Sequence, residues 1–128
     1  MRYLLDTHTL LWWWTDDHQL SDHARELISD ERTEIYVSAA SAWEIATKHR
    51  LGKLSEISDA MPRFNELVQA DGFTHLPVSY LHALKSGGYP QPHRDPFDRM
   101  LAAQSELELM PLISCDKALS GFDIQIIW

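Results

Sequence analysis

Four acidic residues stand at places where a parallel β-sheet would bring them together. Asp6 directly follows one short apolar stretch, and Asp116 follows another after a single intervening residue. Glu44 and Asp98 lie close to the starts of two predicted helices. Clustered carboxylate oxygens are ligands that suit Mg²⁺ or Mn²⁺. If the four side chains converge, the pattern predicts a divalent metal site.

Asp98 also has a structural explanation. In the stretch DPFD, Asp95 is placed as the N-cap of a helix whose first position is Pro96, and Asp98 then occupies the third position. An acid in the first turn of a helix interacts favourably with the helix dipole. The predicted buried stripe of this helix is Phe97, Met100, Ala103, Leu107 and Met110. Asp98 lies about 100° away from that stripe, where it can reach a pocket rim.

The other three acids have structural explanations too. Ser41 and Glu44 fit a capping box, and Glu44 is also spaced to pair with Lys48 one turn later. Asp6 and Asp116 can each cap the turn that follows them. One such acid is ordinary, whereas four that converge are harder to explain by capping alone.

Electrostatics sets the condition that a cluster of acids must meet. Two carboxylates ~5 Å apart repel each other by roughly 3 kcal/mol at an effective dielectric constant near 20. Such a cluster must therefore take up protons or bind cations. The chain lacks the Cys or paired His spacing typical of zinc sites, and it has no glycine-rich phosphate-binding loop.

The elements that must position these acids alternate between strands and helices. Strands are predicted at residues 2–5, 35–38, 73–76, 112–114 and 124–127, and helices at 8–14, 22–30, 42–51, 59–70, 80–85 and 96–109. Expected caps are Ser58 and Ser79 at helix starts, and Gly52, Gly72 and Gly87 at helix ends. This alternation predicts an α/β fold with a mainly parallel sheet of about five strands and helices on both faces, an α/β/α sandwich. Sites in such folds form at the carboxyl ends of the strands.

The overall composition predicts one globular domain over residues 1–128. The 128 residues are 45% hydrophobic and 23% charged, which is ordinary for a globular protein. Neither a membrane span nor a signal peptide is expected, and the single cysteine, Cys115, excludes an intrachain disulfide. A cytoplasmic protein is the simplest expectation. The net charge of −8 argues against a protein that coats nucleic acid, but not against a nuclease whose metal ions supply positive charge.

Four segments of the sequence resemble one known family. YLLDTHTLLW, SAWEI, HRDPFDRMLAAQ and ISCD are similar to the four acidic motifs of PIN-domain ribonucleases, and more narrowly to those of VapC-type toxins of bacterial toxin-antitoxin pairs. By this resemblance Asp6, Glu44 and Asp98 match the three most constant acids. Asp116 matches the fourth, which varies more across the family. Ser114, two residues before it, stands where relatives often have threonine and can still donate a hydrogen bond to a carboxylate.

The resemblance implies a parallel α/β sandwich and a Mg²⁺- or Mn²⁺-dependent endoribonuclease that leaves 5′-phosphate and 3′-hydroxyl ends. It implies that Asp6, Glu44, Asp98 and Asp116 are both catalytic and metal-binding. It also implies a homodimer that is inhibited by a small antitoxin protein.

Basic residues near the motifs are candidates for contacts with RNA phosphates: His8, Arg94, Arg99 and Lys117. Each can equally be a solvated charge, and Arg99 can instead pair with Glu106 or Asp95. The run Trp12, Trp13 and Trp14 can stack on bases, yet three consecutive helical residues point in three directions, so one or two must face the core.

The sequence supports other functions less well. A haloacid-dehalogenase-like phosphatase needs a second aspartate two residues after the first, and that position is His8. A receiver domain needs an acidic pair ahead of its phosphorylated aspartate, which the chain does not supply. A non-catalytic module that uses the same fold to bind RNA or protein stays open as the alternative.

Overall fold

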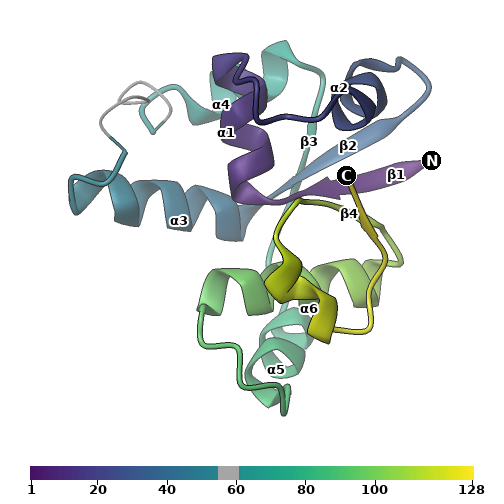
Figure 1. Ribbon diagram of the computed structural model, residues 1–128. Helices are drawn as coiled ribbons and strands as arrows, with labels where there is room; N and C mark the ends of the chain where they lie inside the picture. Colours follow the sequence, from purple (N-terminus) through teal and green to yellow (C-terminus); the bar gives the residue numbers. More distant parts are fainter. Residues whose placement is uncertain (55–60) are drawn as a thin grey trace.

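The sheet is a single parallel sheet of five strands, shown in the computed structural model of Figure 1. The structure describes residues 1–54 and 61–128. The strands are β1 (Arg2–Leu5), β2 (Glu34–Ser38), β3 (Thr74–Leu76), β4 (Leu112–Ile113) and β5 (Ile126–Ile127). Their order across the sheet is β3-β2-β1-β4-β5, and every neighbouring pair is parallel. The central position of β1 places the residue that follows it in the middle of the sheet's carboxyl edge.

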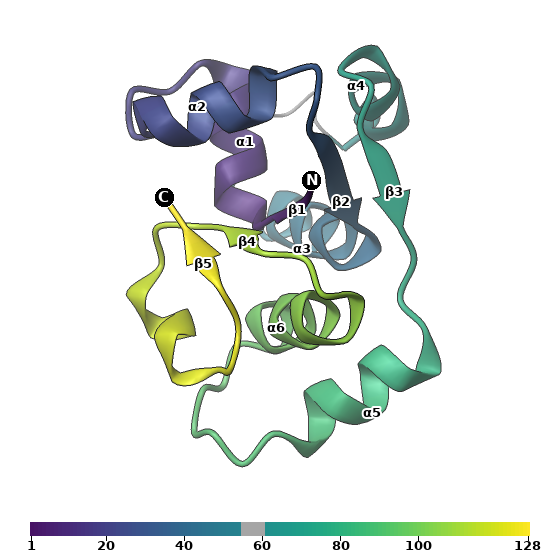
Figure 2. The ribbon, with the colours of Figure 1, turned by 90° about the vertical axis from the view of Figure 1, so that its right-hand side faces the viewer.

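Helices connect the strands and cover both faces of the sheet (Figure 2). They are α1 (Thr7–Thr15), α2 (Asp22–Ser29), α3 (Ala39–Arg50), α4 (Phe64–Ala70), α5 (Tyr80–Gly88), α6 (Pro96–Glu108) and the 3₁₀ helix η2 (Lys117–Gly121). The predicted α/β/α sandwich with a mainly parallel sheet is therefore confirmed.

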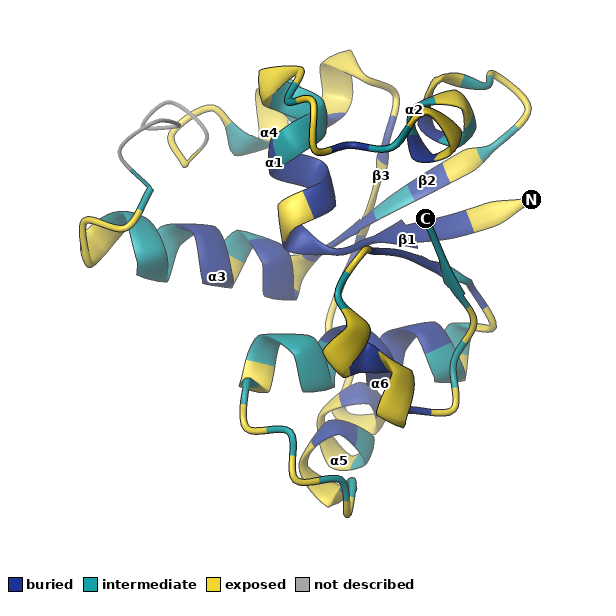
Figure 3. Ribbon diagram, viewed as in Figure 1, coloured by how far each residue is buried: buried dark blue, intermediate teal, exposed yellow. Residues whose placement is uncertain are grey.

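Two apolar cores lie on the two faces of the sheet. Along β1, Tyr3 and Leu5 contribute to the core beneath α1, α2 and α4, whereas Leu4 contributes to the core beneath α6. This alternation follows from the period of two along a strand. Leu4 and Leu5 are both at most 1% exposed, as Figure 3 shows by the continuous burial of the inner part of β1. The part of β1 that is buried on both faces must be apolar, which explains the run Tyr3, Leu4 and Leu5 that precedes Asp6.

The start of α3 differs from the prediction. The helix begins at Ala39 rather than Ala42, because Ser38 is the N-cap and its hydroxyl accepts a hydrogen bond from the amide of Ala40 at 2.9 Å. The capping box predicted from Ser41 is therefore wrong. Glu44 lies in the second turn of the helix instead of the first, so it does not act as a capping residue.

Three smaller predictions also need correction or fall outside the described structure. Gly87 does not end α5, which continues to Gly88, whereas Gly52 and Gly72 do adopt the positive φ typical of a helix end. Leu107 is 42% exposed rather than buried, because the inner face of α6 is centred on residues 101–105. The predicted N-cap Ser58 lies outside the described residues. The helix predicted at 59–70 begins only at Phe64 in the described part of the chain, so its predicted start is wrong for residues 61–63.

Within residues 1–54 and 61–128, no helix combines the length and the apolar character that crossing a membrane requires.

Candidate active site

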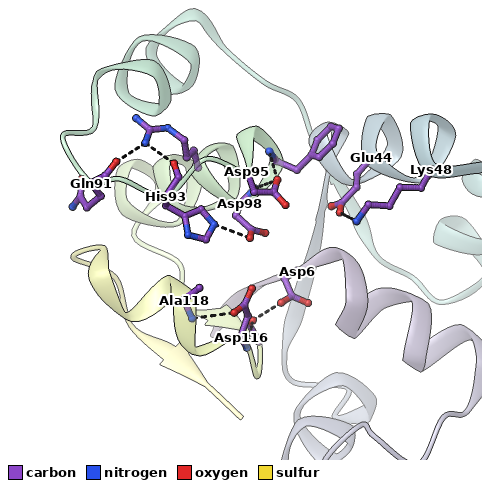
Figure 4. Close-up of polar contacts among 12 residues, drawn as sticks. Asp6, Glu44, Lys48, Gln91, His93, Asp95, Asp98, Asp116 and Ala118 are labelled. Carbon is purple, nitrogen blue, oxygen red and sulfur yellow. Dashed lines mark hydrogen bonds and ion pairs between the residues drawn. The ribbon is translucent and has the colours of Figure 1, made fainter. Parts of the chain in front are cut away.

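The four acids predicted from the sequence come from elements that meet at the carboxyl edge of the sheet (Figure 4). Asp6 follows β1, Asp116 follows β4, Asp98 lies in the first turn of α6, and Glu44 projects from α3. In Figure 4 the carboxylates of Asp6, Asp98 and Asp116 face a common space, and Glu44 lies at its border. The structure thus brings together residues that are up to 110 positions apart in the sequence.

Asp6 is a buried carboxylate that is held on both of its oxygens. Only 5% of the residue is exposed. Its Oδ1 accepts a hydrogen bond from the amide of Thr9 at 2.8 Å, which makes it the N-cap of α1, and its Oδ2 accepts one from the hydroxyl of Ser114. Burial raises its pKa despite these hydrogen bonds. The predicted capping role and a role in the acidic site therefore coexist in one residue.

Asp98 is held by a histidine from the loop before α6. The Nε2 atom of His93 lies 2.9 Å from Oδ2 of Asp98. Desolvation, together with the nearby charges of Asp95 and Asp116, raises the pKa of Asp98 to about 6, although the hydrogen bond from His93 acts in the opposite direction. Folding therefore makes the anionic form of this carboxylate costly, as expected where acids are gathered in one place.

Glu44 is neutralised within its own helix. Glu44 is 3% exposed. Its carboxylate forms an ion pair with the ammonium group of Lys48 at the predicted i,i+4 spacing. The predicted pair is confirmed. Because a buried carboxylate without a partner is expensive, Lys48 makes the burial of Glu44 tolerable.

Asp116 and Asp95 act as caps at two helix starts. Oδ1 of Asp116 accepts a hydrogen bond from the amide of Ala118 at 2.9 Å and begins η2. Oδ1 of Asp95 accepts hydrogen bonds from the first-turn amides of α6, as predicted. The hydroxyl of Ser114 links the two central acids, because it donates to Asp6 while accepting from the amide of Asp116 at 3.0 Å.

The donor chemistry of this edge suits a hard divalent cation, but the side chains are not gathered around one point. In the part of the chain that the structure describes, no three His, Cys, Asp or Glu side chains come close enough to hold one ion. Glu44 and Asp98 are instead paired with Lys48 and His93. Burial raises the pKa of both Asp6 and Asp98, so a bound cation would relieve a real electrostatic cost at these two carboxylates.

The four basic residues predicted to contact RNA differ in how far their side chains are already bound to the rest of the protein. His8, Arg94 and Lys117 are exposed, and none of them forms an ion pair with another described residue. His8 packs against Trp12, with the ring centroids 5.8 Å apart. These three residues are exposed and stand within two positions of Asp6, His93 or Asp116 in the sequence.

Arg99 is already fully engaged with the protein. Its guanidinium donates four hydrogen bonds of 2.7–3.0 Å to the main-chain carbonyls of Ser86, Tyr89, Gln91 and His93. It pairs with neither Glu106 nor Asp95, which were its expected alternatives. The described partners of Glu106 are Lys85 at 3.2 Å and the hydroxyl of Tyr89 at 2.7 Å. Arg99 thus fixes the loop between α5 and α6, and that loop carries His93.

The three tryptophans of α1 pack against the core on the face of the sheet that α1 and α2 cover. All three side chains are partly buried against the core under α1. The indole N–H groups of Trp13 and Trp14 donate to the same carboxylate oxygen of Asp71, at 3.3 and 2.9 Å, and the ring of Trp12 packs against Trp128. The prediction that one or two of them face the core falls short, because all three pack against it.

Sequence analysis did not identify the specific pairing of His93 with Asp98. The histidine lies five residues before the acid, in a loop without a periodic pattern, so spacing alone gave no reason to join them. The only signal in the sequence was its closeness to the DPFD stretch.

Solved structures and a curated protein share features with this chain. The crystal structure of VapBC2 from Rickettsia felis, bound to a DNA fragment from its promoter, matches with a TM-score of 0.71 and 14% identity over 100% of this chain and 99% of that one. A toxin-antitoxin complex from Klebsiella pneumoniae matches with a TM-score of 0.64 and 16% identity over 98% and 96% of the two chains. These likenesses establish the fold.

The curated protein is ribonuclease VapC16 of Mycobacterium tuberculosis, which is 36% identical over 61 residues. That match covers 48% of this chain and 43% of the relative, which is less than half of the relative's length. A family model described as the PIN domain matches residues 3–124, a range that contains all four acids of the candidate site. With nearly its whole length matched, and with the parallel sheet and the acidic edge in place, the chain belongs to the PIN-domain family.

Proposed function

We propose that this protein is a divalent-metal-dependent endoribonuclease that acts in the cytoplasm as the toxin of a toxin-antitoxin pair. The observation that carries the proposal is the meeting of Asp6, Glu44, Asp98 and Asp116 at the carboxyl edge of a PIN-domain sheet. The likeness to ribonuclease VapC16 and to toxin-antitoxin complexes supports the substrate class and the biological role.

The four carboxylates are the proposed ligands of Mg²⁺ or Mn²⁺. A bound ion of this kind lowers the pKa of a water molecule and neutralises charge that develops on a phosphodiester. Hydrolysis by water leaves a 5′-phosphate and a 3′-hydroxyl on the products. The donors are all hard oxygens, which fits these two metals better than zinc or copper.

The chain's own residues then orient the acids and the RNA. Ser114 keeps one oxygen of Asp6 fixed, and His93 does the same for Asp98. Lys48 balances the charge of Glu44, a role that a bound metal ion would share. Arg94, Lys117 and His8 are the proposed phosphate contacts, whereas Arg99 contributes by holding the loop that carries His93.

The test is cleavage of RNA by the purified chain. We expect cleavage of single-stranded RNA with Mg²⁺ or Mn²⁺, no cleavage with EDTA, and a loss of about 100-fold or more in Asp6→Asn and in Asp98→Asn, because each removes a group that stabilises charge in the reaction. The matched control is Asp123→Asn, an exposed acid away from this edge, which should cleave as the unchanged chain does.

Two results would contradict the proposal. Cleavage that persists in EDTA or in both site variants would rule out the metal site. Absence of cleavage on every RNA tested would favour the alternative, a module that binds RNA or protein without catalysis. The pairing of Glu44 with Lys48 and of Asp98 with His93 is the observation that keeps this alternative in view.

The toxin role has its own test. Expression of the unchanged chain should arrest bacterial growth, Asp6→Asn should not, and co-expression of the protein encoded by the neighbouring small reading frame should restore growth. Harmless expression of a chain that cleaves RNA in vitro would leave the nuclease assignment standing and refute the toxin role.

A further inference from the structure

A cavity adjoins the acidic edge on the side of η2. It has a volume of about 320 Å³ and is lined by Gln91, Pro92, His93, Ala118, Gly121 and Phe122. Two of these residues form hydrogen bonds with the acids themselves: His93 with Asp98, and the amide of Ala118 with Asp116. In Figure 4, Gln91 and His93 lie on one side and Ala118 on the other, with the acids beside them. A ligand at the acids is therefore next to this cavity.

The walls of the cavity combine rings with one directed polar group. The rings of His93 and Phe122 meet edge to face, with their centroids 5.7 Å apart, and Pro92 adds an exposed apolar surface. Phe122 itself is only 4% exposed, so the surface open to a base is that of the partly buried His93 ring and of Pro92. Unstacked bases in protein–RNA complexes pack against ring surfaces of this kind.

Gln91 supplies the polar group. Its Nε2 donates to the carbonyl of Gly121 at 3.1 Å, which bridges the two walls and fixes the orientation of the amide. Its Oε1 is shielded from solvent and has no hydrogen-bond partner among the described residues. A shielded carbonyl oxygen without a partner is costly, so a donor from a ligand would be favourable there.

The loop that forms one wall is rigidly held. The guanidinium of Arg99 bonds to the carbonyls of Gln91 and His93, both at 2.9 Å, as well as to two earlier carbonyls. A wall fixed in this way can select a ligand by shape, because little reorganisation is needed on binding.

The charges around the cavity favour an anionic polymer. Arg94 follows His93 and Lys117 precedes Ala118, so one exposed cation stands beside each wall. Neither forms an ion pair with another described residue. A nucleotide bound here would have its phosphates between these cations and the acidic edge.

We propose that this cavity is the subsite for one nucleobase of the RNA, next to the phosphodiester that is cleaved, and that Oε1 of Gln91 selects bases that carry an exocyclic amino donor. The inference rests on the proposed nuclease function and adds a specificity determinant to it. Adenine, cytosine and guanine each offer an exocyclic amino group, whereas uracil offers a single imino N–H.

The experiment compares base preferences within one digest. A pool of RNA with randomised sequence is cleaved by the unchanged chain, by Gln91→Met and by Ala118→Leu, and the new ends are sequenced. The unchanged chain should prefer amino-bearing bases over uracil at one position beside the cut. Gln91→Met should reduce that preference about fivefold to tenfold, the value of one hydrogen bond, and Ala118→Leu should reduce it by partly filling the cavity.

The readout is a ratio among bases within each digest, which a uniform loss of activity or stability does not change. Gln69→Met on α4 and Ala83→Leu on α5 are exposed matched controls and should keep the ratio of the unchanged chain. Identical base ratios in Gln91→Met, Ala118→Leu and the unchanged chain would refute the subsite while leaving the nuclease assignment intact. No cleavage by the unchanged chain would refute the nuclease assignment, and the subsite with it.

Discussion

Asp98 carries a charge that the folded chain disfavours. Because its pKa rises to about 6, the folded state binds a proton more tightly than the unfolded state does. The resulting loss of stability is absent below the ordinary pKa near 4. It grows as the pH rises toward 6 and is complete above that.

Asp98→Asn should therefore stabilise the metal-free protein while abolishing its activity. We expect a gain of about 1–3 kcal/mol in the free energy of unfolding at pH 8, which shrinks as the pH falls from 6 toward 4. Urea denaturation with EDTA at a series of pH values measures it. Asp123→Asn serves as the exposed control and should show no such pH-dependent gain. A destabilised Asp98→Asn at pH 8 would contradict this account.

Lys48 should matter more for stability than an exposed lysine does. Lys48→Met leaves the buried carboxylate of Glu44 without its partner. We expect a loss of about 2 kcal/mol, below the ~3–5 kcal/mol for a fully buried pair, because the side chain of Lys48 is 31% exposed. The double variant Glu44→Gln with Lys48→Met should recover most of that loss. A double-mutant cycle by denaturation measures the coupling, and additive losses would show that the pair contributes nothing.

At the scale of single residues, the sequence identified the four acids but not their immediate partners. The Glu44–Lys48 pair was predictable because both residues share one helix and a fixed spacing. The contact of Asp98 with His93 depends on the path of a loop, and that path is set by the hydrogen bonds of Arg99, for which no periodic pattern exists.

Among the elements, the loop between α5 and α6 depends most on a single side chain. Arg99→Lys keeps the charge but cannot reach four carbonyls at once, because an ammonium lacks the planar fork of a guanidinium. We expect faster amide hydrogen exchange in residues 89–95 and a loss of about 1–3 kcal/mol in stability. Arg32→Lys, whose described contacts are only with the nearby Asp30, is the matched control. Unchanged amide hydrogen exchange in residues 89–95 would refute the inference that Arg99 holds this loop in place.

The predicted elements match the structure well where the apolar pattern was strong. β1 has the predicted boundaries, α2 and α6 differ from theirs by one residue at the C-terminal end, and α1 is one residue longer than predicted at each end. The start of α3 was missed by three residues, because two serines compete as the N-cap and the choice of Ser38 depends on a long-range contact. Its hydroxyl also donates to the buried Oε1 of Gln104 in α6, at 2.5 Å.

For the whole molecule, we expect the purified chain to be a homodimer, as its VapC-like sequence motifs imply. Light scattering after size exclusion should then give a mass near two chains of 14.8 kDa each. A monomer at micromolar concentration would show that dimerisation is weak or needs a partner.

The parallel sheet itself followed from the alternation of elements, whereas the strand order depends on contacts between distant segments that periodicity does not encode.

The hydrogen bond between Ser114 and Asp6 joins residues 108 positions apart. Protein synthesis proceeds from the N-terminus, so Asp6 leaves the ribosome long before Ser114 and Asp116 do. Until the segment that forms β4 emerges and pairs with β1, the acidic edge lacks Asp116 and the Ser114 hydroxyl that holds Asp6. The acidic edge is therefore complete only after nearly the whole chain has been synthesised, and this delay is a direct result of placing the first strand at the centre of the sheet.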